Sequence, residues 1–275
     1  MTTTSDRPGF TFYLYCLMSA RDGSDLAIGM ENVCGIGGLP VTLIPAGEII
    51  AVLSALPAEQ WQAETIETRL SDPNWVEREV LAHEAVVERC LAAESVLPCK
   101  FLTIFSSLDA VLVMLAHDAD RLRQALERVT GRREWAVKLL ANPAEIRECC
   151  ERTEEMLALV EAAAGRTRGQ SFFLQKQYAR ELNDLADRQL EEVAATVHDR
   201  LTALAGGDIV VADTYDLASG EKILLNLALL LPNQESEALR AVVEELGLQV
   251  PRGFRLTLSG PWPPYHFTGA GGQDE

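Results

Sequence analysis

The chain has 275 residues, and its 24 lysines and arginines against 41 aspartates and glutamates give a formal net charge of −17. This length exceeds one typical domain of roughly 100–200 residues and is enough to bury two cores without metal or disulfide support. Hydrophobic residues make up 48% of the sequence, which excludes global disorder, and the excess of acids in both halves argues against nucleic acid and anionic membranes as partners.

The N-terminus and the cysteines predict a cytoplasmic location. The opening residues, MTTTSDRPGF, lack the apolar run of a secretory signal, and no uncharged stretch reaches the roughly 20 apolar residues of a membrane-spanning helix. The six cysteines show no CxxC pair and no paired spacing. This pattern fits thiols in a reducing compartment and predicts neither a structural disulfide nor a bound metal.

Periodicity predicts a first domain at residues 1–141. Apolar and β-branched runs indicate strands, and apolar positions at spacings of three and four indicate helices. The resulting order, β-β-β-α-β-α-β, describes a modified ferredoxin-like domain with an altered start. In chain order we expect strands at 10–18, 41–44 and 48–54, a helix at 73–93, an extended segment at 96–103, a helix at 108–129 and a strand at 134–140.

A second domain is predicted at residues 142–275. Asn142 and Pro143 form a helix start, and the long helices that follow are expected to join the two domains. The apolar run at 222–231 does not alternate, so it predicts a central strand that is covered on both faces. We expect helices at 143–164 and 171–204, strands at 208–217 and 222–231, a helix at 235–248 and a strand at 252–260. The fold class is therefore α/β (α+β), with two ferredoxin-like-related domains.

No catalytic or metal-binding motif is complete. His83-Glu84 begins an HExxH pattern, but Val87 stands where the second histidine is required, so we predict that His83 is buried and hydrogen-bonded. The sequence GIGG at 35–38 is followed by Pro40 and a strand rather than by a helix N-terminus, which argues against a dinucleotide loop. We therefore assign no catalytic, cofactor-binding or metal-binding residue and predict that the protein is not an enzyme.

Residues 260–267 (GPWPPYHF) place prolines among aromatic side chains directly after the last predicted strand. Proline stops strand pairing and favours a stiff polyproline-II conformation. Two interpretations stay open for Trp262, Tyr265 and Phe267. Their side chains either fold back onto their own domain or form a docking arm, because rigid aromatic side chains make good interface anchors. These three are the candidate protein-binding residues.

The same segment resembles the GPWPPYxF ending of the gas vesicle protein F/L (GvpF/GvpL) family. Four further segments are similar to blocks of that family: YLYC at 13–16, HEAV at 83–86, LPCKFLT at 97–103 and EWAVK at 134–138. In the third of these, Lys100 and Leu102 replace the arginine and the glycine of an LPxRFGT pattern. The resemblance extends over nearly the whole chain.

The resemblance implies a minor, non-enzymatic gas vesicle protein with a two-domain α/β fold, located in the cytoplasm at the gas vesicle. It implies a part in vesicle assembly or nucleation through binding of the hydrophobic major shell protein, alongside other gas vesicle accessory proteins. Such a shell subunit aggregates readily before assembly, and an acidic partner with apolar grooves or sheet edges can cover its apolar face. An alternative is a small-molecule-binding regulatory protein with paired ferredoxin-like domains. Whether the chain corresponds to the F or the L paralogue is left open.

Overall fold

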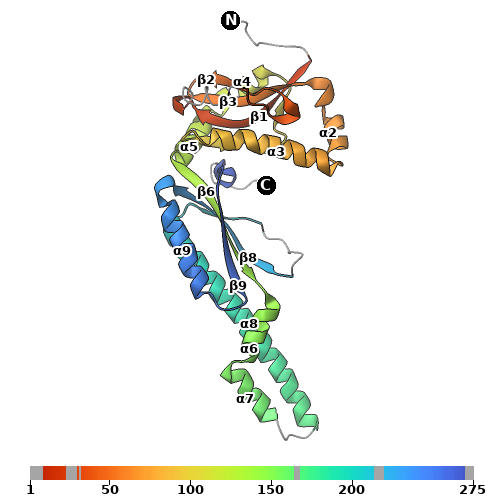
Figure 1. Cartoon of the computed structure of the whole chain (residues 1–275), viewed down its shortest axis with the longest axis vertical. Coiled ribbons are helices and arrows are strands. Elements are labelled where there is room, and N and C mark those ends of the chain that lie inside the picture. The colour runs from red at the N-terminus through yellow and green to blue at the C-terminus, as the bar shows by residue number, and fades with distance from the viewer. Residues whose placement is uncertain (1–8, 23–29, 31, 164–167, 214–219, 270–275) are drawn as a thin grey trace. The chain divides into compact units, whose positions relative to one another are not determined.

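The computed structural model shows two compact units (Figure 1). The residues it describes are 9–22, 30, 32–163, 168–213 and 220–269. Unit 1 comprises the described residues within Met1–Glu134 and Pro261–Glu275, and unit 2 comprises those within Trp135–Gly260. The chain therefore leaves unit 1 after Glu134 and returns to it after Gly260. Each unit combines an antiparallel sheet with helices, which confirms the predicted α/β class.

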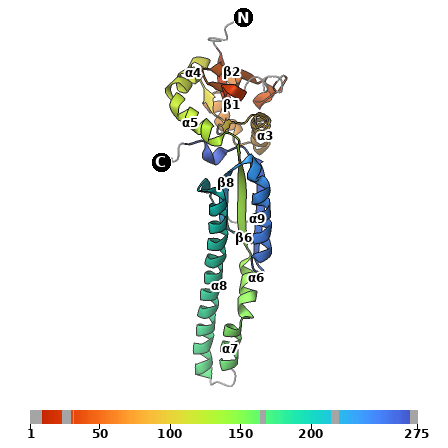
Figure 2. The same ribbon diagram turned by 90° about the vertical axis from the view of Figure 1, so that its left-hand side faces the viewer.

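Unit 1 is a sheet with helices on both of its faces. Its strands are β1 (Phe10–Ser19), β2 (Thr42–Ala46), β3 (Ile49–Pro57), β4 (Val96–Pro98) and β5 (Ile104–Phe105), and its helices are α2 (Ala63–Arg69), α3 (Pro73–Cys90), α4 (Leu108–His117) and α5 (Ala119–Val129). The strand order is β2-β3-β1-β4, and β5 also pairs with β1. Helix α3 covers one face, and α4 and α5 cover the other (Figure 2). Tyr13 and Tyr15 of β1 are buried with Val86 and Val87 of α3.

Unit 2 is a second sheet with its own core. Its strands are β6 (Arg132–Ala141, which enters from unit 1), β7 (Ile209–Val211), β8 (Lys222–Pro232) and β9 (Phe254–Trp262), and its helices are α6 (Pro143–Glu151), α7 (Glu154–Ala163), α8 (Arg168–Ala205) and α9 (Ser236–Gln249). Alternate residues of β6, such as Trp135, Val137 and Leu139, pack in one cluster with the helices. Helix α7 and the first part of α8 lie side by side beyond the end of this sheet (Figures 1 and 2).

The apolar run of β8 lies inside the sheet, as its pattern predicts. The strand order is β7-β8-β6-β9, so β8 has a neighbour on each side. Leu227, Leu229 and Leu231 point into the core, and Ala228 and Leu230 between them are buried as well. Both faces of this stretch are therefore covered, which explains why its apolar residues do not alternate with polar ones.

The two sheets share the same order of four strands, and the sheet of unit 1 has β5 in addition. Numbered in chain order within each unit, the strands follow the order 2-3-1-4 in both. Strand β6 supplies the first strand of unit 2, although the sequence assigned it to the end of the first domain, because it pairs with β8 and β9 and packs on the helices of unit 2. Helices α6 to α8 consequently lie within unit 2, between β6 and β7, whereas they were expected to join the domains. Residues 261–269 belong to unit 1, whereas the expected division placed them in the second domain.

Several elements differ from their expected bounds. The helix expected at 108–129 is divided at Asp118, which ends α4 and begins α5. The helix expected at 143–164 is likewise divided into α6 and α7. The strand expected at 208–217 is described only as the short β7, and 214–217 lie outside the described residues. In the described part of the chain, no helix combines the length and the apolar character needed to cross a membrane.

Replacing glycine by alanine should change the free energy of unfolding in opposite directions at two positions. A Cβ atom at Gly35 would overlap the hydroxyl group of Tyr15, whereas a Cβ at Gly247 in helix α9 would meet no atom within 4 Å. We expect Gly35→Ala to lower the free energy of unfolding by about 1–3 kcal/mol, because the core around Tyr15 has no room. Gly247→Ala should raise it by about 0.5–1 kcal/mol, because alanine favours a helix interior. Urea unfolding measures both, and a stable Gly35→Ala variant would contradict the close packing.

Candidate functional site

The segment that follows β9 returns to unit 1. After Trp262 the chain passes through Pro263 and Pro264 into a short 3-10 helix, Tyr265–Phe267. In the antiparallel sheet the end of β9 lies beside the start of β6, where the chain comes from unit 1. This pairing brings the segment to unit 1, whereas the division expected from the sequence placed it in the second domain.

The three candidate binding residues differ in exposure. Phe267 is 1% exposed, and the guanidinium group of Arg128 lies 5.3 Å from the centre of its ring. Tyr265 is partly buried, while Trp262 is 42% exposed. Two of the three side chains therefore point into unit 1. A docking role for the segment stays a prediction, and it now depends mainly on Trp262.

A chain of hydrogen bonds through His83 holds Tyr265. The Nδ1 atom of His83 lies 2.8 Å from the Tyr13 hydroxyl, and its Nε2 atom lies 3.2 Å from the Tyr265 hydroxyl. Tyr265 in turn donates to Oε1 of Glu84 at 2.8 Å. His83 itself is 1% exposed, which confirms that it is a buried and hydrogen-bonded histidine.

One arrangement of protons satisfies this chain. The backbone N–H of Leu102 donates to the Tyr13 hydroxyl at 3.0 Å, which leaves the hydroxyl proton of Tyr13 for Nδ1 of His83. With its own proton on Nε2, His83 then donates to Tyr265, and Tyr265 donates to Glu84. His83 is neutral in this arrangement, as an enclosed imidazole should be.

Burial shifts the ionisation of these groups. Loss of water lowers the pKa of His83 from 6.5 to about 4, and a hydrogen bond with the backbone of Cys99 opposes that shift. Burial also raises the pKa of Tyr13 and Tyr265 far above the usual value for tyrosine. The pKa of Glu84 is raised by burial, against the opposing effect of the hydrogen bond from Tyr265. All of these shifts favour the neutral forms, so the cluster is built to hold the segment rather than to carry charge.

Glu134 and His266 form a second attachment. Glu134 is 3% exposed and accepts a hydrogen bond from the backbone N–H of His266 at 3.0 Å, and its other oxygen lies 2.7 Å from Nδ1 of the same residue. The hydrogen bond with Glu134 raises the pKa of His266, although partial burial works against it. This ion pair fixes the backbone of the segment next to Phe267.

A neighbouring set of bonds holds the GIGG loop. The Tyr15 hydroxyl accepts a hydrogen bond from Ile36 N–H at 2.9 Å and lies 3.0 Å from Oγ of Ser54. Gly37 N–H donates to the buried Glu79 carboxylate at 2.6 Å. These amides of the loop bind side chains of unit 1, which explains the glycines without a phosphate ligand.

Sequence reasoning identified the aromatic segment but missed the residues that hold it, namely Tyr13, Glu84, Glu134 and His266. A usable signal was the position of His83 on an apolar helix face, because a buried imidazole requires polar partners. Leu102, where the family pattern has glycine, has a φ angle of 67°. This left-handed conformation, which glycine adopts without cost, directs the Leu102 N–H toward Tyr13.

The described residues form no metal centre. In the ranges that the structure describes, no three His, Cys, Asp or Glu side chains are grouped so as to hold a metal ion. All six cysteines lie in these ranges as free thiols. Cys150 is buried and Cys149 is partly exposed on the same helix, so the adjacent side chains point in different directions.

Comparison with known proteins gives matches over almost the whole chain. A family described as gas vesicle synthesis protein GvpL/GvpF matches residues 11–269. Gas vesicle protein L of a Streptomyces species is 30% identical over 264 residues, which cover 95% of this chain and 94% of that protein. Gas vesicle protein L2 of Halobacterium salinarum is 26% identical over 266 residues, covering 93% and 90% of the two chains.

A solved structure has the same fold. The crystal structure of the gas vesicle protein GvpF from Anabaena sp. matches with a TM-score of 0.68 at 16% sequence identity, and the match covers 97% of this chain and 99% of that one. The arrangement of two related sheets, one of them carrying long helices, is therefore found in an experimentally determined protein.

Removing the aromatic groups of the segment should destabilise unit 1. Phe267→Ala should lower the free energy of unfolding by about 3–5 kcal/mol, because it empties a buried site. Tyr265→Phe keeps the ring but removes the hydroxyl that bonds to Nε2 of His83 and to the Glu84 carboxylate, which should cost about 1–3 kcal/mol. Phe173→Ala is a matched control, because Phe173 is 74% exposed. Urea unfolding of the three variants measures these changes. Equal losses of unfolding free energy in Phe267→Ala and Phe173→Ala would contradict the attachment of residues 261–269 to unit 1.

The stability of the protein should depend on pH through His83. The folded pKa of about 4 lies below the ordinary value of 6.5, so the contribution of neutral His83 is complete above pH 6.5 and is lost as the pH falls toward 4. Between pH 7.5 and 5.5 this loss is roughly 1 kcal/mol. The raised pKa of His266 acts in the opposite direction, because its contribution is lost as the pH rises above 6.5.

His83→Gln isolates the effect of His83. The slope of the free energy of unfolding against pH should be smaller in this variant than in the original chain, whatever its absolute stability. His117→Gln controls for the removal of an exposed histidine from the same unit. An unchanged slope in His83→Gln would show that His83 is not held neutral.

Proposed function

This chain belongs to the GvpL/GvpF family of gas vesicle synthesis proteins, and on that basis we propose that it is a minor, non-enzymatic protein of gas vesicle formation that binds the hydrophobic major shell protein. In this role it takes part in assembly or nucleation of the vesicle in the cytoplasm, together with other gas vesicle accessory proteins. The observation that carries the proposal is the extent of the family match. The match covers residues 11–269, which include the described parts of both units and the segment at 261–269 that packs on unit 1.

Exposed apolar side chains support a role in binding an apolar partner. Trp262 is 42% exposed at the end of the edge strand β9. A second group lies where α7 and the start of α8 run side by side, at Leu157, Val160, Phe172 and Phe173, which are between 49% and 74% exposed. Exposed apolar groups of this kind are typical of protein-binding surfaces. Strand β9 lies at an edge of its sheet, and edge strands are a common place for another chain to pair.

The small-molecule regulator stays the second candidate. Unit 1 has a cavity of about 640 Å³, which is within the size range of ligand sites. A thermal shift in the presence of a cell extract fraction of small molecules, with no binding of shell protein, would favour this alternative over the proposed function.

Binding of the shell protein should depend on Trp262. If its indole ring is an anchor, Trp262→Ala should weaken binding by about 1–3 kcal/mol while the melting temperature stays within a few degrees of the original. Leu248→Ala is a suitable control, because Leu248 is 84% exposed in unit 2. Pull-down of purified major shell protein by the immobilised chain, with melting curves for each variant, makes the measurement.

Three outcomes of that experiment are informative. No retention of shell protein by the original chain contradicts the proposed function. Retention by the original chain and equally by Trp262→Ala removes this residue from the interface. Lost binding together with a lowered melting temperature assigns Trp262 to the stability of the fold.

A further inference from the structure

A groove in unit 1 lies between helices α4 and α5 and the rim of the sheet. The cavity measures about 640 Å³. Its walls come from the ends of β1 and β4, from the turn between β2 and β3, and from the facing sides of the two helices. All of these elements belong to unit 1. The residues that hydrogen-bond to the segment at 261–269, namely His83, Glu84 and Glu134, do not line the groove.

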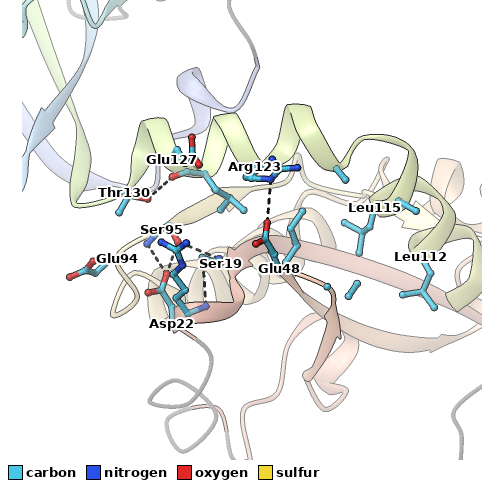
Figure 3. Close-up of a pocket in the computed structure, with 17 residues that line it drawn as sticks. Ser19, Asp22, Glu48, Glu94, Ser95, Leu112, Leu115, Arg123, Glu127 and Thr130 are labelled. Atoms are coloured by element: carbon cyan, nitrogen blue, oxygen red, sulfur yellow. Dashed lines mark hydrogen bonds and ion pairs between the residues drawn. The ribbon is translucent and has the colours of Figure 1, made fainter.

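The groove is apolar at one end and polar at the other. Figure 3 shows Leu112 and Leu115 of α4 at the apolar end. The polar end has the side chains of Asp22, Glu94 and Glu127, together with Ser19, Ser95 and Thr130. Arg21, next to Asp22 in the chain, also lines the groove. Between the two ends, Arg123 of α5 pairs with Glu48 of the β2–β3 turn at 3.3 Å.

Carboxylates outnumber the basic side chains at the polar end, because Asp22, Glu94 and Glu127 line it together with Arg21, and Arg133 lies near Glu94. The polar end therefore keeps a negative charge. Asp22 is bound locally, because it accepts hydrogen bonds from the hydroxyl of Ser95 at 2.6 Å and from its backbone N–H at 3.2 Å. Glu94 and Glu127 are both exposed. The Glu48–Arg123 pair is also largely exposed, at 76% and 50% of the two side chains, so solvent screens it and it can open at little cost.

From this pattern we propose that the groove is a docking site for a basic amphipathic helix of a partner protein. Apolar side chains on one face of such a helix contact Leu112 and Leu115, and a lysine or arginine at one end of that face reaches Glu94 and Glu127. Helices commonly bind grooves in this way, with anchors spaced three and four residues apart. Charge complementarity selects the basic helix, since an acidic one would be repelled by the rim and by the net charge of −17.

The occupant follows from the chemistry of the groove and does not depend on the shell protein. The site therefore goes beyond the function proposed above, and it can fail or succeed independently of it.

A synthetic probe tests the proposal on the full chain. The probe is a fluorescein-labelled helical peptide of 14 residues with leucine on one face and two lysines at one end of that face. A peptide with glutamate in place of lysine is the comparison. Fluorescence anisotropy should show binding of the lysine peptide that weakens between 50 and 300 mM NaCl, because the salt screens the contact with the rim.

Two variants and two controls locate the contact. Ala116→Trp fills the groove from α4, and Gln124→Trp places the same side chain on a part of α5 that does not line it. Glu94→Gln with Glu127→Gln removes two charges at the rim, and Glu59→Gln with Glu64→Gln removes two exposed charges elsewhere in unit 1. We expect each groove variant to weaken binding at least tenfold and each control to change it less than twofold. Melting curves confirm that all variants are folded.

Several outcomes overturn the proposal. Equal weakening by the rim variant and its control means that the peptide binds the acidic chain as a whole. Unchanged binding by Ala116→Trp excludes the groove. Binding of the glutamate peptide with equal affinity, or no binding of the lysine peptide, removes the basic helix as occupant. If n-butylamine displaces the peptide completely and Ala116→Trp has no effect on peptide binding, then the polar end binds small organic cations rather than a helix.

Discussion

His83 loses its contact with water when the protein folds, and both of its ring nitrogens must then find partners within the protein. Tyr13 supplies one partner from the central strand of unit 1, and Tyr265 supplies the other from a segment far along the chain. Replacing either tyrosine by an apolar ring removes a hydrogen bond from this buried imidazole, which is costly in a medium of low dielectric constant. The need to satisfy one neutral imidazole therefore connects the interior of unit 1 to the path of the chain after β9.

The same strand holds a second irregular segment. The rings of Tyr13 and Tyr15 lie 4.8 Å apart, and their hydroxyl groups serve different parts of the chain. Tyr13 acts through His83 on the segment around Tyr265, while Tyr15 binds the GIGG loop directly. Each of these segments forms no more than a single 3-10 turn, so it has few backbone hydrogen bonds of its own, and buried hydroxyl and carboxylate groups supply partners instead. Glu79 and Glu134 contribute in the same way.

Much of the fold could be predicted from local patterns, because periodicity reveals which face of an element is buried. The helix of His83, the central place of β8 and the inward face of β9 follow from spacing alone. Periodicity does not reveal which core a face joins, so β6 was assigned to the wrong sheet. The division at Asp118 was missed because the apolar stripe continues through it. The partners of Tyr265 could not be predicted for a similar reason, because a hydrogen bond between residues 83 and 265 produces no local sequence pattern.

The route of the chain has a consequence for biosynthesis. Unit 2 is inserted, in sequence, between the two parts of unit 1, so the ribosome makes the sheet of unit 1 first and the residues that complete it last. Domains generally begin to fold during translation in the order of their synthesis. A nascent chain therefore carries His83 without Tyr265, which lies 182 residues further on, and Glu134 without His266, which lies 132 residues further on. Unit 1 can therefore be completed only after unit 2 has been translated. A chain that ends before residues 261–269 leaves buried groups of unit 1 exposed, and chaperones and proteases can recognise such a surface.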